Sequence, residues 1–269
     1  MKILQGNLVY SPRLGELVTT PRGALVLSDD GVLLDVLPAA PENADAERID
    51  YGDMLLMPSF VDMHLHAPQY PMLGMGMDLP LMDWLHTYTF RTEARFADTD
   101  FARRTYRRLA HDLITGGTTR VCMFSSLHTD ATLILMEELE RAGVTGYVGK
   151  VNMDRGSEML RETTEESKRE TLRWLDACGQ FRRIKPILTP RFTPSCTDAL
   201  LAWLGKLGEE RGLYVQSHLS ENDGEIALVK SLHPDCPQAS SQRSVSRLLS
   251  SVVSRSVSPL LRSMLTLPT

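Results

Sequence analysis

From Met54 onward, short apolar runs alternate with segments of helical periodicity, and this alternation constrains the fold more than any other feature of the sequence. The runs that we expect to form strands are Leu55–His64, Thr118–Ser125, Gly146–Met153, Ile184–Pro190 and Leu213–His218. The expected helices are Asp100–Thr115, Asp130–Ala142, Thr164–Cys178, Thr197–Arg211 and one around Asp223–Leu232. Repeated strand–helix units imply a parallel sheet with helices outside it. The sequence therefore predicts an α/β fold. We expect an incomplete TIM-type (β/α) barrel that has about five of the usual eight strands.

This alternation does not extend to either end of the chain. Residues 1–53 contain short apolar runs separated by turn signals such as Asp29-Asp30-Gly31, which predicts a small β-rich domain. Residues 54–238 then hold the partial barrel. Residues 239–269 are rich in serine and arginine and contain no acidic residue, a composition typical of a disordered tail.

Bulk properties of the chain narrow the kinds of partner that it binds. The formal net charge is −5, which argues against nucleic acid or an anionic membrane as a partner. No apolar run approaches the roughly 20 residues that span a bilayer, and the N-terminus has no signal-peptide pattern. The cysteines form no C-x-x-C pair, so we expect free thiols in a reducing cytoplasm; they are Cys122, Cys178, Cys196 and Cys236.

Two histidines lie one residue apart at the end of an apolar run in MPSFVDMHLHAPQY. Side chains at i and i+2 of a strand point to the same face, so His64 and His66 would aim both imidazoles at one spot. That spot lies at the C-terminal edge of the sheet, where barrel enzymes place their active sites. Imidazole nitrogen suits Zn²⁺ or Fe²⁺. The pair alone is also compatible with ordinary polar surface.

A second constellation lies in LYVQSHLSEN, where another apolar run ends in His218 and Glu221 follows three residues later. His218 could meet the first two histidines across the mouth of the barrel, and a carboxylate there suits proton transfer. Considered without the other two histidines, His218 would be interpreted as a polar residue at a helix N-terminus.

A third element is ILTPRFTPS, in which a strand ends just before Arg191 and Phe192. The guanidinium of Arg191 could donate hydrogen bonds to a carbonyl group, and the ring of Phe192 could stack on a flat ligand. The alternative is a turn with a solvated arginine.

The remaining histidines and the methionine-rich stretch have plainer interpretations. His86, His111 and His233 are expected to be structural or exposed. His128 follows the second strand near the mouth of the barrel, where it could contact the site, but we expect it to cap a helix. We interpret residues 71–84, PMLGMGMDLPLMDW, as a flexible apolar loop over the pocket rather than a soft-metal site.

Six segments of the chain together resemble the guanine deaminase branch of the amidohydrolase superfamily, from about residue 50 to about residue 238. They are MPSFVDMHLHAPQY, DLPLMDWLHTYTFRTEARF, GGTTRVCMFSSLHTDAT, VGKVNMD, KPILTPRFTPSC and VQSHLSEN. The H-x-H and H-x-x-E patterns are shared across that superfamily. The DLPLMDWLHTYTF, TPRF and QSHLSEN segments are specific to the guanine deaminase branch.

The resemblance implies zinc-dependent hydrolysis of guanine to xanthine and ammonia, in the cytoplasm, with one Zn²⁺ per subunit or Fe²⁺ in its place. It also implies a homodimer for the full-length family. The roles that it implies are metal ligation by His64, His66 and His218, proton transfer by Glu221, and binding of guanine by Gln69, Arg191 and Phe192. The other zinc deaminase class, which carries P-C-x-x-C, is excluded because the chain has no C-x-x-C.

The sequence also departs from the family pattern. A histidine on the sixth strand and a metal-binding aspartate on the eighth have no counterpart, and the strands that complete the N-terminal β-sandwich are missing. We therefore expect a C-terminally truncated member that is inactive or insoluble as it stands. Two alternatives remain open: an amidohydrolase that deaminates or dehalogenates another aromatic heterocycle, and a non-catalytic purine-binding fragment.

Overall fold

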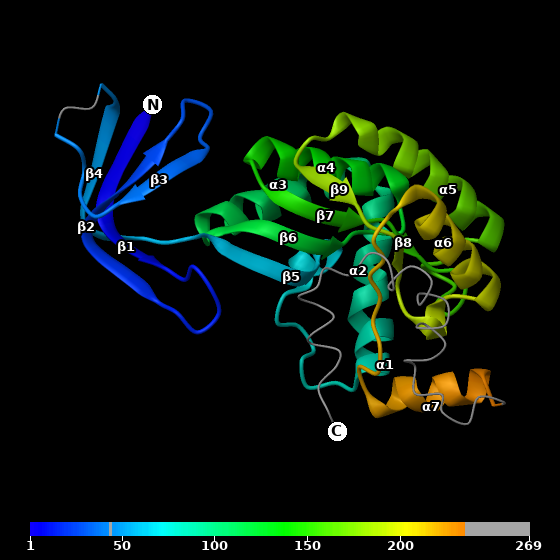
Figure 1. The fold of residues 1–269 in the computed structure, drawn as a ribbon. Helices are drawn as coiled ribbons and strands as arrows, with labels where there is room; N and C mark the ends of the chain where they lie inside the picture. The colour runs from blue at the N-terminus through cyan, green and yellow to red at the C-terminus, as the bar shows by residue number, and fades with distance from the viewer. Residues whose placement is uncertain (43–44, 235–269) are drawn as a thin grey trace. The chain divides into compact units, whose positions relative to one another are not determined.

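The computed structural model describes residues 1–42 and 45–234, which form two compact units divided between Phe60 and Val61 (Figure 1). The tail expected at residues 239–269 lies outside the described residues. The domain limits expected from the sequence, after residues 53 and 238, stay predictions. No helix in the described part of the chain is long and apolar enough to cross a membrane.

The N-terminal unit is a single sheet of four strands in the order β3-β2-β1-β4. The strands are β1 (Lys2–Tyr10), β2 (Val18–Leu27), β3 (Leu33–Leu37) and β4 (Glu47–Leu56). Strand β1 runs antiparallel to β2 and parallel to β4. Gly31 closes the turn between β2 and β3 with a φ of +84°, a conformation that glycine adopts without steric cost. The β-rich N-terminal segment predicted from the sequence is confirmed.

The larger unit is built on a sheet with the strand order β5-β6-β7-β9, beside a short parallel pair of β8 and β10. The strands are β5 (Phe60–His66), β6 (Thr118–Phe124), β7 (Thr145–Gly149), β8 (Val151–Asn152), β9 (Ile184–Pro186) and β10 (Thr189–Pro190). Strand β7 is parallel to both β6 and β9. The predicted α/β fold with a parallel core and a small N-terminal sheet is thus confirmed.

The helices of the larger unit follow the strands in sequence and pack against their neighbours, α3 on α4, α4 on α5 and α5 on α6. Figure 1 shows α3, α4 and α5 lying along one side of the sheet. They are α3 (Thr99–Thr115), α4 (Thr129–Ala142), α5 (Thr164–Ala177), α6 (Asp198–Arg211) and α7 (Asp223–Leu232). A buried apolar core lies between helices and strands, with Trp174, Leu135 and Val148 fully buried.

The ends of these helices follow from local sequence. Helix α5 starts with a capping box, in which Thr163 and Glu166 satisfy each other's backbone N–H groups. Helix α4 is followed by Gly143, which takes the left-handed conformation that commonly ends a helix. His128 occupies the N-cap position of this helix, and Asp130 lies in its first turn, where a negative charge is favourable.

The fifth predicted strand, Leu213–His218, forms an isolated parallel bridge, Leu188 to Val215, and no extended ladder. The backbone of Leu188 bonds to Tyr214 and Gln216, both at 2.9 Å. In a parallel ladder the next backbone N–H that would point at residues 213–218 comes two residues after Leu188. That residue is Pro190, and proline has no N–H. The ladder therefore stops, although the segment stays beside β10 and reaches the same edge of the sheet.

Residues 67–97 form short helical pieces between β5 and α3. They are η1 (Ala67–Met72), α1 (Leu81–Trp84), the π-helical η2 (Leu85–Thr89), α2 (Phe90–Ala94) and η3 (Arg95–Ala97). Two more 3₁₀ turns follow later in the chain, η4 (Cys178–Gln180) and η5 (Thr193–Ser195). The methionine-rich stretch is mostly turns between η1 and α1, and Met77 is 75% exposed there.

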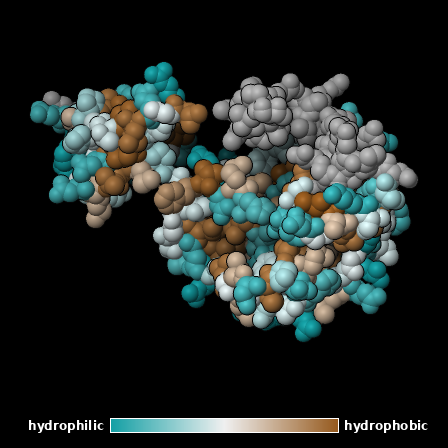
Figure 2. Space-filling view, turned by 90° about the horizontal axis from the view of Figure 1, so that it is seen from below, coloured by the Kyte–Doolittle hydropathy of each residue, from teal (hydrophilic) through white to brown (hydrophobic). Residues whose placement is uncertain are grey.

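Large apolar side chains are exposed on both units, and Figure 2 shows hydrophobic surface on each of them. On β5, Val61 and Met63 are 53% and 67% exposed. Because alternate residues of a strand face opposite sides, these two lie on the face away from His64 and His66. The face of β5 opposite His64 therefore carries exposed apolar side chains at Val61 and Met63.

Candidate active site

Strand β5 carries His64 and His66 at its C-terminal end, as the alternation of the sequence predicts. After His66 the chain leaves the extended conformation and enters the 3₁₀ helix η1, which has Pro68 near its start. The two imidazole rings lie with centroids 5.2 Å apart and their planes at 78°. The prediction that both rings aim at one spot on the strand edge is therefore confirmed.

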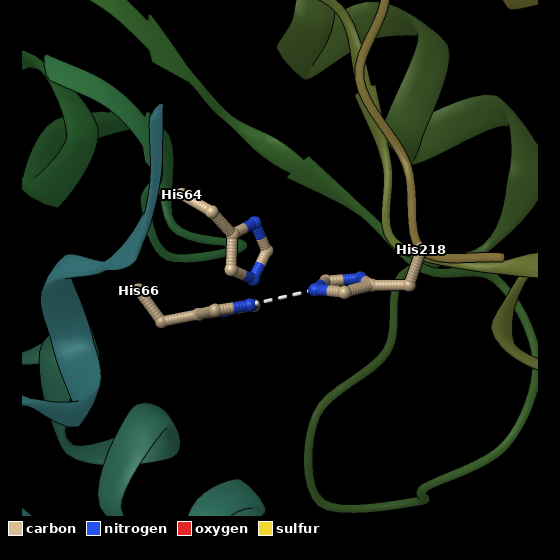
Figure 3. Close-up of side chains that lie close together, drawn as sticks. All are labelled: His64, His66 and His218. Carbon is tan, nitrogen blue, oxygen red and sulfur yellow. Dashed lines mark hydrogen bonds between the residues drawn. The ribbon is translucent and has the colours of Figure 1, made fainter. Parts of the chain in front are cut away.

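His218 brings a third imidazole to the same spot from the segment beside β10 (Figure 3). Its backbone N–H donates to the carbonyl oxygen of Arg191 at 3.0 Å, and its Nδ1 lies 2.7 Å from the same oxygen. A carbonyl only accepts, so Nδ1 carries the proton and Nε2 keeps a free lone pair. That Nε2 lies 2.8 Å from Nε2 of His66. The interpretation of His218 as a simple helix-start residue is wrong.

Electrostatics keep two of these rings neutral near pH 7. Burial lowers the pKa of His66 well below its ordinary value, and the charge of Arg191 lowers it further. Burial also lowers the pKa of His218 to about 4, although its hydrogen bond to the Arg191 carbonyl acts in the opposite direction. Neutral imidazole is the form that binds a metal.

The donor set fits a metal ion of the zinc type. Ring nitrogens of His64, His66 and His218 all lie within 4.8 Å of one another. Three imidazoles with room for a further ligand are the donor pattern of catalytic zinc sites. This group could therefore hold one ion between β5 and the His218 segment.

A cavity of about 270 Å³ opens beside the three histidines. Its lining contains every residue that the sequence singled out for a functional role: His64, His66, Gln69, Arg191, Phe192, His218 and Glu221. Apolar side chains complete the wall: Leu65, Leu73, Leu81, Trp84 and Leu85. An apolar wall with a few convergent polar groups is typical of a small-molecule site.

Glu221 reaches this cavity from the turn before α7. Its backbone N–H donates to the carboxylate of Glu225 at 2.6 Å, and Asn222 caps the helix. Burial raises the pKa of Glu221, and the negative charge of Glu225 raises it further. A carboxyl group with a raised pKa can take up and return a proton near neutral pH.

Arg191 is buried, with 2% of its surface exposed, so the alternative of a solvated turn arginine is wrong. Its guanidinium forms a two-pronged ion pair with the buried carboxylate of Glu93, at 2.5 Å and 3.1 Å. The side-chain amide of Gln69 donates to the same carboxylate at 3.1 Å. The sequence reasoning missed Glu93, because one glutamate in a short helix carries no spacing signal.

The other histidines lie away from this cavity. His86 is in η2, and His111 is exposed on α3, 3.1 Å from Asp112. His128 occupies the N-cap position of α4 without a side-chain capping bond, and His233 follows α7. The positions of His86, His111 and His233 agree with their prediction as structural or exposed residues, and His128 lies at the helix start where it was expected.

Comparison with known proteins places these residues in a family. The model of the amidohydrolase family matches residues 55–244. Guanine deaminase of Rattus norvegicus is 48% identical over 182 residues, which cover 66% of this chain and 40% of that protein. Guanine deaminase of Dictyostelium discoideum is 38% identical over 255 residues, covering 87% and 56%.

The solved structures agree with the sequence relatives. Guanine deaminase from C. acetobutylicum, solved with guanine in its active site, superposes with a TM-score of 0.87 at 40% identity. The match covers 92% of this chain and 59% of that one. The chain thus spans about half the length of the relatives that it matches.

Proposed function

Since the chain belongs to the amidohydrolase family, we propose that it catalyses the hydrolytic deamination of guanine to xanthine and ammonia. One observation carries this proposal: three imidazoles, a carboxyl group and a buried arginine line the same small cavity. The similarity to guanine deaminases, one of them solved with guanine bound, supports guanine as the substrate.

The metal ligands in this proposal are His64, His66 and His218. Zinc held by them would act as a Lewis acid that makes hydroxide available near neutral pH. Fe²⁺ is the second candidate, since imidazole also suits iron. Burial lowers the pKa of His66 and lowers the pKa of His218 to about 4, so protons compete little for these ligands near neutral pH.

Glu221 is the proposed proton shuttle. Water adds to the carbon that bears the 2-amino group, the bond to that amine breaks, and ammonia leaves. Glu221 accepts one proton from the attacking water and passes it to the ring nitrogen, and then carries the second proton of that water to the departing amine. Its raised pKa, caused by burial and by Glu225, suits both halves of this exchange.

Gln69, Arg191 and Phe192 are proposed to bind the purine. Arg191 and Gln69 supply polar contacts from one side of the cavity, and the ring of Phe192, 4% exposed, supplies an apolar surface. We further propose a cytoplasmic homodimer. The free thiols of Cys122, Cys178 and Cys196 are consistent with that compartment.

The test is ammonia release from guanine by the purified chain, measured with and without added zinc. Glu221→Gln should lower turnover by at least about 100-fold while zinc and guanine still bind. Glu209→Gln, an exposed change on α6, is the control and should leave turnover unchanged. Binding of guanine without turnover by the unmutated chain would refute the catalytic proposal and favour a purine-binding fragment.

Metal ligation needs its own measurement. His66→Ala should lower zinc content and weaken zinc affinity at least about tenfold, because one of three ligands is lost. His111→Ala, on the exposed face of α3, is the matched control. A panel of guanine, adenine, cytosine and a chlorotriazine then tests the substrate, and preferential turnover of any compound except guanine would contradict the proposal.

A further inference from the structure

One buried carboxylate holds two of the cavity residues in place. Glu93, in α2, is 0% exposed. Its oxygens accept two hydrogen bonds from the guanidinium of Arg191, at 2.5 Å and 3.1 Å, and one from Nε2 of Gln69, at 3.1 Å. Among the described residues, Arg191 forms an ion pair with Glu93 alone. Glu93 therefore links the strand edge that carries Arg191 to the turn that carries Gln69.

This contact fixes the polarity of the Gln69 amide. An ionised carboxylate only accepts hydrogen bonds, so it must face the NH₂ group of Gln69 and never its carbonyl oxygen. The carbonyl oxygen is then left as an acceptor at the cavity. The guanidinium has five N–H groups and gives two to Glu93, so further donors remain on Arg191. The cavity thus holds an acceptor at Gln69 and a donor at Arg191.

We propose that Glu93 is a positioning residue that makes this cavity select a lactam edge, a ring carbonyl next to a ring N–H. The carbonyl of such an edge accepts from Arg191, and its N–H donates to Gln69. Guanine and hypoxanthine carry this edge, whereas adenine presents the reverse order, an amine donor next to a ring-nitrogen acceptor. The inference rests on the proposed function, in which Gln69 and Arg191 contact the purine.

The surroundings of Glu93 explain why one carboxylate can control this choice. Arg191 is itself buried, with the ring of Phe90 5.2 Å from its Cζ atom and the sulfur of Met153 3.9 Å from one nitrogen. Neither neighbour can replace a negative charge. Without Glu93, the guanidinium would turn toward another acceptor, and the Gln69 amide could rotate by 180° at little cost. Either change would remove the fixed order of donor and acceptor.

The experiment compares the affinity of the chain for hypoxanthine and for adenine. Neither has the 2-amino group that guanine would lose, so the comparison measures binding and not turnover. In the unmutated chain hypoxanthine should bind more tightly. Glu93→Gln should weaken hypoxanthine binding by about 10- to 100-fold, the effect of losing charge-assisted hydrogen bonds, and change adenine binding much less.

The control is Glu138→Gln. Glu138 is also a buried glutamate that pairs with arginine, here Arg103 and Arg141, but it lies between α3 and α4 and outside the cavity. It should lower stability and leave the preference for hypoxanthine intact. If Glu93→Gln does not fold, Glu93→Asp keeps the charge with a shorter reach, and the preference should fall at least about threefold.

The outcomes separate this inference from the proposed function. An unmutated chain that binds neither purine would contradict the purine site itself. An unmutated chain that prefers hypoxanthine, together with a Glu93→Gln variant that keeps the same preference, would overturn the role of Glu93 alone. Equal weakening of both purines by Glu93→Gln would also overturn it, because that pattern indicates a purely structural residue.

Discussion

Replacing Glu162 by glutamine would leave the ammonium group of Lys150 buried without its counter-charge. The side chain of Lys150 is 0% exposed, and its Nζ atom lies 2.9 Å and 3.0 Å from the two carboxylate oxygens of Glu162. The other acceptor at Nζ is the carbonyl oxygen of Val151, at 3.4 Å. Burial lowers the pKa of Lys150, and Glu162 counteracts that effect. We therefore expect Glu162→Gln to destabilise the larger unit strongly at neutral pH.

The size of the effect has two limits. Removing one partner of a buried ion pair typically costs about 3–5 kcal/mol. Lys150 can avoid a larger cost by releasing its proton, which from an unfolded pKa of about 10.4 costs about 5 kcal/mol at pH 7 and about 2 kcal/mol at pH 9. The folded pKa lies below the unfolded one, so the unfolded chain binds more protons and stability rises with pH. The loss should therefore shrink from about 3–5 kcal/mol at pH 7 to at most about 2 kcal/mol at pH 9.

Urea unfolding followed by tryptophan fluorescence measures this loss. All three tryptophans, Trp84, Trp174 and Trp203, lie in the larger unit, so the signal reports that unit alone. The control is Glu210→Gln, which breaks an exposed pair with Lys206 and should cost less than about 0.5 kcal/mol. A cost of Glu162→Gln below about 1 kcal/mol that does not change with pH would refute the reasoning.

Other predictions concern local stability in the described parts of the chain. Burial raises the pKa of Glu140, but the backbone N–H groups of residues 182–184 lower it more, so its pKa lies below its ordinary value. Its stabilising effect is therefore present above about pH 4.3 and is lost as pH falls through the lowered folded pKa. When the pH is lowered from 7 to 3 and unfolding is followed by tryptophan fluorescence, the Glu140→Gln variant should thus lose less stability than the unmutated chain. Gly149→Ala should destabilise by at least about 2 kcal/mol in urea, because its Cβ would lie 1.7 Å from Oγ1 of Thr189. Thr163→Ala should cost about 1 kcal/mol, through loss of the α5 cap, and an unchanged urea midpoint would contradict that role.

The sequence predicts those parts of the site that follow from strand geometry. The period of two along a strand is sufficient to direct His64 and His66 to one face. Because parallel strands end at the same edge of a sheet, His218 is predicted at that edge too. Proline is the reason why the fifth strand is a bridge and not a ladder, since Pro190 removes one donor from the edge that faces residues 213–218. That effect depends on register, and register is set by tertiary pairing.

Glu93 shows the limit of this reasoning. Its partners Arg191 and Gln69 lie 98 and 24 residues away in the sequence, and no periodic pattern links them. Its burial depends on how the short helices between β5 and α3 fold over the sheet edge. The sequence predicts Arg191 at the site but not the carboxylate that orients it.

The contact between His66 and His218 has a consequence for the order of folding. The two residues are 152 positions apart in the chain. Joining points so far apart in a disordered chain costs about 5 kcal/mol of loop entropy. In the unfolded chain an ion could therefore bind at most to the neighbouring pair His64 and His66. The third ligand, His218, becomes available only once β5, β6, β7 and β9 have assembled. Added zinc should accordingly slow the unfolding of the larger unit and leave its folding rate almost unchanged.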